Sequence, residues 1–248
     1  MGKLTETIKI LLIINVIFFV GTMLSGTADL FTVWYPENPK FHFWQVITHM
    51  FMHSQSFYGH IIFNMLGLWM FGTPLEQIWG RNKFLFFYFS AGLGAYALSV
   101  GIDYFNVSGG IEALVNAGYD KNSIMDVLAE GKYNKAWAQV LGQDKLESLL
   151  GAYNMGSLGA SGAIMGLLVG FGMLFPNTPL MLIFLPIPIK AKYFIPAVVL
   201  LDIILGFTGG SSIFGVNIAH WAHVGGALTG LIIAWYWKKN NMNSHRWN

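Results

Sequence analysis

The sequence predicts an all-α membrane protein with six transmembrane helices. Of its 248 residues, 54% are hydrophobic and only 10% are charged, whereas a soluble domain carries about 25% charged residues. A helix needs roughly 20 mostly apolar residues to cross a bilayer, and six stretches meet this need: residues 8–27, 60–79, 84–101, 158–175, 194–210 and 217–237. We therefore interpret residues 1–248 as one membrane domain in contact with a lipid bilayer.

The first of these stretches follows a short charged start, "MGKLTETIK". It lacks the small-x-small cleavage site of a secretory signal, so we expect it to be retained as a membrane helix. The chain contains no cysteine, which excludes disulfides, thiolate metal sites and cysteine nucleophiles. Its net charge of +2 is too small to indicate nucleic acid as a partner.

The connections between the spans differ in charge. Nine of the fourteen lysines and arginines fall in the N-terminal segment, the turn 80–83, the loop 176–193 and the C-terminal segment. Six spans place these four segments on one side of the membrane, and segments rich in Lys and Arg stay cytoplasmic. We therefore expect both termini to be cytoplasmic, in a membrane that we interpret as the bacterial inner membrane.

Two segments are expected on the outer side. Residues 28–59 are rich in aromatic side chains, as is typical of a loop at the level of the lipid headgroups. Residues 102–152 hold seven acidic residues and four lysines. Their pattern predicts short amphipathic helices, which form an extramembrane insertion between the third and fourth spans without a core of its own.

Polar residues recur at the outer ends of the second, fourth and sixth spans. His60 and Asn64 begin the second, Ser161 begins the fourth, and His220 and His223 begin the sixth. With a rise of ~1.5 Å per residue, all lie within roughly 10 Å of the outer boundary. A lone serine in a membrane helix usually serves packing, but ionisable residues inside a membrane indicate function. The shared depth of all five favours a functional site.

These residue types suit nucleophilic catalysis. A serine hydroxyl such as Ser161 becomes a nucleophile when a base such as His223 takes its proton. The oxyanion that then forms needs donors, for which the backbone N–H of Ser161 and the side chains of His60 and Asn64 are candidates. Asp202 lies in the middle of the fifth span and Glu76 near the inner end of the second. No carboxylate is therefore expected beside the histidine, and the prediction is a Ser/His dyad.

Glycines favour His223 over His220 as the base. His223, Gly226 and Gly230 lie on one face of the sixth span, where small residues allow close approach of a neighbouring helix. A second glycine stripe, residues 162, 166 and 170, points away from Ser161. We expect that stripe to pack against a different helix.

Three motifs give the chain a resemblance to a known family. "HIIFN" (60–64), "GASG" (159–162) and "AHVGGALTG" (222–230) occur in this order on the expected spans. With them, residues 40–100 and 156–238 resemble the rhomboid family of intramembrane serine proteases. The resemblance implies a six-helix rhomboid-like bundle and a serine endopeptidase that needs no cofactor or metal. It would cut single-span membrane proteins near the outer end of their transmembrane helix.

The resemblance also implies roles for individual residues. Ser161 would be the nucleophile and His223 the general base, while His60, Asn64 and the Ser161 backbone N–H would form the oxyanion hole. The loop 28–59 would be partly embedded in the membrane, and the segment before the sixth span would be a mobile cap.

The sequence departs from the family pattern at two positions. Gln45 follows Trp44 where the family often has arginine, so that arginine's role in anchoring the loop is expected to be missing. Met165 stands where an aromatic residue commonly stacks on the base. A methionine still contacts an imidazole but orients it less firmly.

The sequence alone leaves three other functions open. An inactive relative would bind transmembrane helices without cutting them, although Ser161 and His223 are both present. A metal site would draw on five histidines, namely His49, His53, His60, His220 and His223, but catalytic zinc often also has a carboxylate ligand. A channel or transporter would need polar residues across the whole membrane, whereas these stop at one depth.

Overall fold

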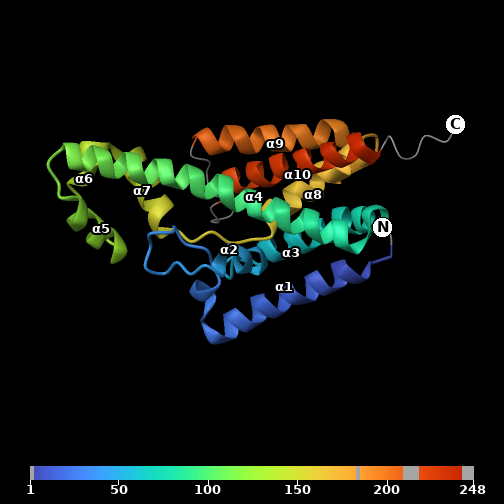
Figure 1. Ribbon diagram of the computed structural model, residues 1–248, viewed down its shortest axis with the longest axis horizontal. Helices are drawn as coiled ribbons and strands as arrows, with labels where there is room; N and C mark the ends of the chain where they lie inside the picture. Colours follow the sequence, from blue (N-terminus) through green and yellow to red (C-terminus); the bar gives the residue numbers. More distant parts are fainter. Residues whose placement is uncertain (1–2, 183–184, 209–217, 242–248) are drawn as a thin grey trace.

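The computed structural model describes residues 3–182, 185–208 and 218–241 (Figure 1). Helices dominate the described residues, and a two-stranded sheet joins them. The elements are α1 (Glu6–Ser25), η1 (Ala28–Leu30), α2 (Gln45–Thr48), η2 (His49–Phe51), α3 (Gly59–Gly67), η3 (Leu68–Gly72), α4 (Thr73–Asn116), α5 (Lys121–Ala129), α6 (Trp137–Leu141), α7 (Gln143–Asn154), α8 (Ser161–Leu174), β1 (Pro179–Leu182), β2 (Leu185–Lys190), α9 (Ala191–Thr208) and α10 (His220–Asn241).

The apolar helices identify the chain as a membrane protein. Among the described residues, three helical stretches are long and apolar enough to cross a bilayer: Glu6–Ser25, Gly59–Asn116 and Ala191–Thr208. Helix α8 is apolar but has only 14 residues. The predicted start of the sixth span, residue 217, and the predicted end of the fifth, residues 209–210, lie outside the described residues.

One glycine divides the long helical stretch 59–116 in two. Gly80 has φ 73° and ψ 165°, a conformation with positive φ that residues other than glycine rarely adopt. The Trp79 ring, just before this break, packs against the Phe87 ring with 4.8 Å between centroids. The chain therefore turns back at Gly80, which separates the predicted spans 60–79 and 84–101.

Glu76 has a structural role at the end of α1. Its buried carboxylate accepts hydrogen bonds from the backbone N–H groups of Thr7 and Ile8, each at 3.3 Å, and from the Thr5 hydroxyl. The first N–H groups of a helix have no partner within it, and a negative charge there is favourable. Glu76 therefore ties the start of α1 to α4.

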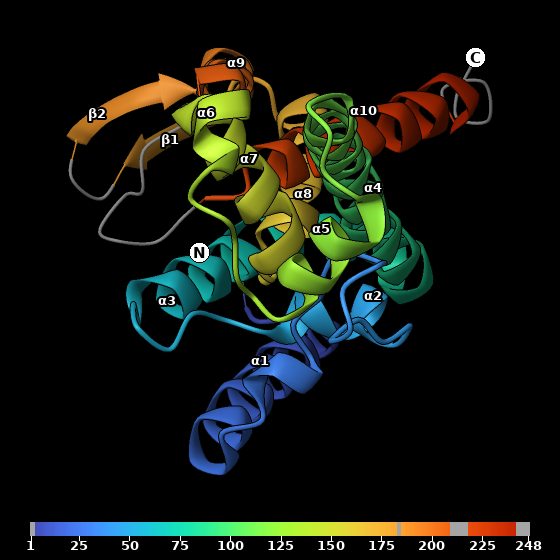
Figure 2. The same cartoon turned by 90° about the vertical axis from the view of Figure 1, so that its left-hand side faces the viewer.

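The insertion differs from its prediction in two ways. Helix α4 does not end near residue 101 but runs on to Asn116, and α5, α6 and α7 gather at that end of the molecule (Figures 1 and 2). These helices also bury a hydrophobic cluster of their own, so the expectation of an insertion without a core is wrong. The buried members of the cluster are Tyr35, Val107, Ile111, Leu114, Ile124, Leu128, Trp137, Leu141, Leu146, Leu149 and Tyr153.

The loop 176–193 is not irregular throughout. Strands β1 and β2 pair antiparallel within it, with Pro179 opposite Lys190 and Leu180 opposite Ile189, and Figure 2 shows them at the side of the helices. The all-α prediction omitted this small sheet.

Glycines bring α8 into close contact with α10. A Cβ atom added to Gly226 would lie 1.8 Å from the carbonyl oxygen of Gly162, and one added to Gly230 would lie 2.7 Å from the Cα of Gly166. The prediction that Gly226 and Gly230 admit a neighbouring helix is therefore confirmed. The prediction that the stripe on α8 faces elsewhere is wrong in part, because Gly162 and Gly166 contact α10 as well as Ala95 and Ala91 of α4.

Candidate functional site

The structure brings Ser161 and His223 into hydrogen-bond contact. Ser161 is the first residue of α8, and His223 lies in the first turn of α10, above the glycine contact. The Ser161 Oγ lies 2.9 Å from His223 Nε2. The close packing of the two helices sets this distance, because a larger residue at Gly226 would separate them.

Asp202 completes a chain of hydrogen bonds, and the expectation that no carboxylate reaches the histidine is wrong. His223 Nδ1 lies 3.2 Å from both carboxylate oxygens of Asp202. A carboxylate only accepts, so His223 Nδ1 carries a proton, and in the neutral ring Nε2 is then free to accept from the Ser161 hydroxyl. The arrangement is therefore serine, histidine and aspartate in series.

The Asp202 carboxylate is shared with a second histidine. His220 Nδ1 donates to Asp202 Oδ1 at 2.6 Å, and both residues are 7% exposed. His220 Nε2 is buried and has no partner among the described residues. His220 therefore holds the carboxylate and does not contact the serine. An acidic residue within an apolar span is the signal that could have indicated Asp202, since intramembrane acids are functional by default.

His60 and Asn64 lie on α3, which packs against α8. His60 Nδ1 accepts a hydrogen bond from the backbone N–H of Ser54 at 3.1 Å, so in the neutral ring Nε2 carries the proton and is a donor. The Asn64 side-chain amide is buried and donates to the His60 carbonyl at 2.8 Å. Asn64 thus also braces the helical turn that carries His60.

Gly159 keeps open the space between His60 and Ser161. Its φ is 129°, and a Cβ there would lie 3.1 Å from His60 Nε2 and 3.5 Å from Ser161 Oγ. A small group placed on this side of Gly159 therefore meets both atoms. Within the described residues, the backbone N–H of Ser161 has no acceptor of its own, which leaves it available to the same space.

The loop before α3 supports this backbone. The N–H of Gly159 donates to the His49 carbonyl at 2.9 Å, and Val33 pairs with Ser157 in an isolated bridge. His49 Nδ1 donates to the Gln45 carbonyl at 2.9 Å. Segments more than 100 residues apart in sequence therefore hold Gly159 and Ser161 in place.

Gln45 anchors the loop, contrary to the expectation that this role is missing. It is fully buried, and its Nε2 donates to the carbonyls of Asp29 and Lys40 at 3.2 and 2.9 Å. Its Oε1 accepts from the backbone N–H of His42 at 3.0 Å. A neutral amide therefore anchors the loop carbonyls, although the arginine common in the family is absent.

Two further residues were singled out in the sequence. Met165 is buried in the main hydrophobic core, and its contact with the imidazole stays a prediction. His53 is 1% exposed and its ring packs 5.1 Å from that of His60, while neither of its nitrogens has a partner among the described residues. His53 thus packs edge-to-face on the His60 ring.

The five histidines of the metal hypothesis are not gathered into one group. Within the described residues, the one set of three possible ligands with mutual distances below 4.8 Å is Asp202, His220 and His223. All three are already joined by the hydrogen bonds of the site. His49 instead donates to Gln45, away from this set.

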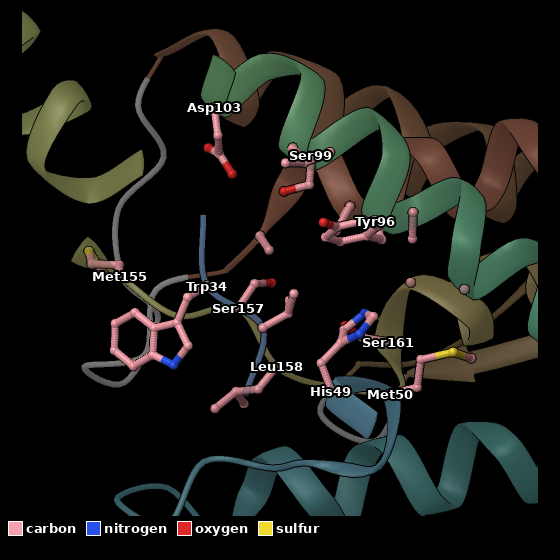
Figure 3. A pocket seen from close by; sticks show the side chains of 18 of the residues that line it. Trp34, His49, Met50, Tyr96, Ser99, Asp103, Met155, Ser157, Leu158 and Ser161 are labelled. Atoms are coloured by element: carbon pink, nitrogen blue, oxygen red, sulfur yellow. The ribbon is translucent and has the colours of Figure 1, made fainter. Parts of the chain in front are cut away.

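Ser161 lines a small pocket that is open to solvent. Figure 3 shows Ser161 and His49 at one end and Asp103, Ser99 and Tyr96 along the wall formed by α4. Trp34, Ser157 and Leu158 lie across from them. The pocket therefore connects the surroundings of Ser161 with solvent.

Comparisons with known proteins identify the family of the chain. The family model described as "Rhomboid domain" matches residues 40–119 and 136–240. Rhomboid protein 1, mitochondrial, of Saccharomyces cerevisiae is 24% identical to the chain over 194 residues. The aligned part covers 78% of this chain and 42% of the yeast protein, so the chain spans less than half of that relative's length. Because the family model covers most of the chain, this protein is an integral membrane protein of the rhomboid family.

Proposed function

We propose that the chain is an intramembrane serine endopeptidase that cleaves single-span membrane proteins near the outer end of their transmembrane helix. The observation that carries this proposal is the 2.9 Å contact between Ser161 Oγ and His223 Nε2. The family supports it, since rhomboid proteins are generally intramembrane serine proteases.

In the proposed reaction, the Ser161 hydroxyl gives its proton to His223 Nε2 as Oγ attacks the substrate carbonyl carbon. The resulting oxyanion lies on the open side of Gly159, where His60 Nε2, the Asn64 amide and the Ser161 backbone N–H supply donors. His223 then protonates the leaving amine, the C–N bond breaks, and an acyl-enzyme remains. Water, deprotonated by His223, hydrolyses the ester and restores the serine.

Asp202 enters this proposal as a positioning residue in place of the plain dyad. Its carboxylate fixes the His223 tautomer in which Nε2 faces Ser161. It also stabilises the imidazolium that forms when His223 takes the proton.

The membrane placement is part of the proposal. We take α1, the two segments on either side of Gly80, α8, α9 and α10 as six spans. Helix α8 has 14 residues, which at ~1.5 Å per residue is about 9 Å short of a bilayer core of ~30 Å. Its first residue, Ser161, is thus recessed below the outer surface. A substrate helix must unwind locally there, because helical peptide bonds are shielded.

The test of the activity uses purified protein in lipid vesicles with a transmembrane reporter substrate. Native protein and a Ser148→Ala control, which alters an exposed hydroxyl in α7, are expected to cut the reporter. Ser161→Ala and His223→Ala are expected to leave it uncut. Cleavage by the Ser161 variant at the native rate would overturn the proposal, and absence of cleavage by every protein would favour the inactive-relative alternative.

The orientation has its own test, because a chain without cysteine accepts single labels cleanly. Lys132→Cys in the insertion and Arg81→Cys beside Gly80 both lie at exposed positions. In intact bacterial cells, an impermeant maleimide is expected to label the former, and the latter only after permeabilisation. The opposite pattern would reverse the proposed placement of the termini.

A further inference from the structure

A carboxyl side chain, that of Asp103, lines the pocket that leads to Ser161. Tyr96, Ser99 and Asp103 follow one another along one face of α4, and Figure 3 shows the Asp103 carboxylate projecting from that helix toward the pocket. Among the described residues lining the pocket, Asp103 is the sole acid, and neither lysine nor arginine accompanies it.

Among the described residues, the Asp103 carboxylate has no counterion. It is half-buried, and within that part of the chain it forms neither a hydrogen bond nor an ion pair. Lys40, the basic residue of the neighbouring loop, is already paired with Asp29 at 2.7 Å. A carboxylate partly removed from water gains from an opposite charge, and none of the residues that the structure describes supplies one.

The electrostatics of the neighbouring residues agree with a negative pocket. Tyr35 lies in the loop 28–44 and also lines the pocket. Burial, followed by nearby negative charges that include Glu37 and Asp103, raises the pKa of Tyr35 to about 12. The phenol therefore stays neutral and adds no charge to the pocket.

The position of Asp103 sets where in a substrate its partner would lie. Ala95 of α4 faces Gly162, directly after Ser161, and Asp103 is eight residues further along the helix. At ~1.5 Å per residue, the carboxylate is about 12 Å from the level of the serine. An extended peptide covers ~3.3 Å per residue. The four-carbon stem of a lysine would cover the remaining part of the distance between the peptide and the Asp103 carboxylate.

From this placement we propose that the pocket recognises a lysine or arginine about two or three residues from the bond that is cut, with Asp103 as the residue that selects it. Aromatic and aliphatic side chains of the pocket, Trp34, Leu158 and Val100, suit the apolar stem. The substrate class is a single-span membrane protein with a basic residue beside its scissile bond. This inference rests on the proposed protease function.

The test measures kcat/KM for reporters that carry a single Lys, Gln or Glu at each of four positions on either side of the cut. For the native protein we expect one position at which Lys is preferred to Gln by about 5- to 20-fold, as for a partly desolvated ion pair. In Asp103→Asn the preference is expected to vanish. In Asp103→Lys it is expected to change to Glu.

Glu112→Gln is the matched control, because it removes the same charge from an exposed position on the same helix; it is expected to keep the native preference. An unchanged preference in Asp103→Asn, or no preference at any position in a native protein that cuts the reporters, would overturn this inference alone. Failure of the native protein both to cut any reporter and to react with a fluorophosphonate would overturn the protease function and the inference with it.

Discussion

Replacing Asp202 by asparagine is expected to slow cleavage about 10- to 100-fold while leaving KM nearly unchanged. A hydrogen bond to a charged group contributes about 1.5–3 kcal/mol, and each 1.4 kcal/mol is tenfold. His223 Nδ1 lies 3.2 Å from the Asp202 oxygens, the long end of the ordinary range. His220 also shares the carboxylate at 2.6 Å. For both reasons, the expected loss of kcat is smaller than the loss of about 10⁴-fold on replacing an aspartate that serves a catalytic triad alone.

The assay separates positioning from folding. Values of kcat and KM are measured on the transmembrane reporter for Asp202→Asn, Asp202→Glu and the control Thr208→Val, which alters an exposed residue on the same helix. The glutamate keeps the charge and is expected to recover part of kcat, whereas the control keeps all of it. A kcat within twofold of native in Asp202→Asn would refute the role. So would an equal loss in Asp202→Glu in a variant whose melting temperature matches the native value.

Three further outcomes follow from the geometry. Asn64→Ala is expected to lower kcat by up to 10²–10³-fold, the loss for one oxyanion donor, and unchanged kinetics would remove it from the site. Gly226→Ala is expected to destabilise the fold by about 1–3 kcal/mol through overpacking, because its Cβ would meet a backbone oxygen. Gly101→Ala is the control, because a Cβ there meets open space. Equal melting temperatures of the two variants would contradict this prediction. Burial lowers the pKa of His49 to about 4. Between pH 7 and pH 5, His49 gains a proton in the unfolded protein but not in the folded one. The free energy of unfolding is therefore expected to fall by about 2 kcal/mol over this range. The His49→Asn variant is expected to lack this pH dependence.

Much of the arrangement was predictable from spacing. The apolar stretches and the glycine faces predicted that α8 and α10 approach each other, and Ser161 and His223 do lie in contact. This part was accessible because depth in a membrane follows from position along a helix. The chemical roles of the two residues stay predictions.

Contacts that depend on how each helix or loop is oriented were less accessible from the sequence. Asp202 reaches His223 from α9. The depth of Asp202 in the membrane did not predict this contact, because the contact depends on the tilt and rotation of α9 beside α10. Gln45 shows the same limit, since its bonds go to loop carbonyls whose directions the sequence does not specify. The extension of α4 to Asn116 was missed because a helix continues past the apolar span when new partners such as Trp137 cover it.

The most direct test of the central claim is to map the site of covalent reaction. Native protein in vesicles is treated with a fluorophosphonate, digested and analysed by mass spectrometry. The account predicts one adduct, on Ser161, formed at least tenfold more slowly in His223→Ala, while the hydroxyls of Ser99 and Ser157 in the same pocket stay unmodified. An adduct on another serine, or an equal rate of labelling without His223, would contradict it.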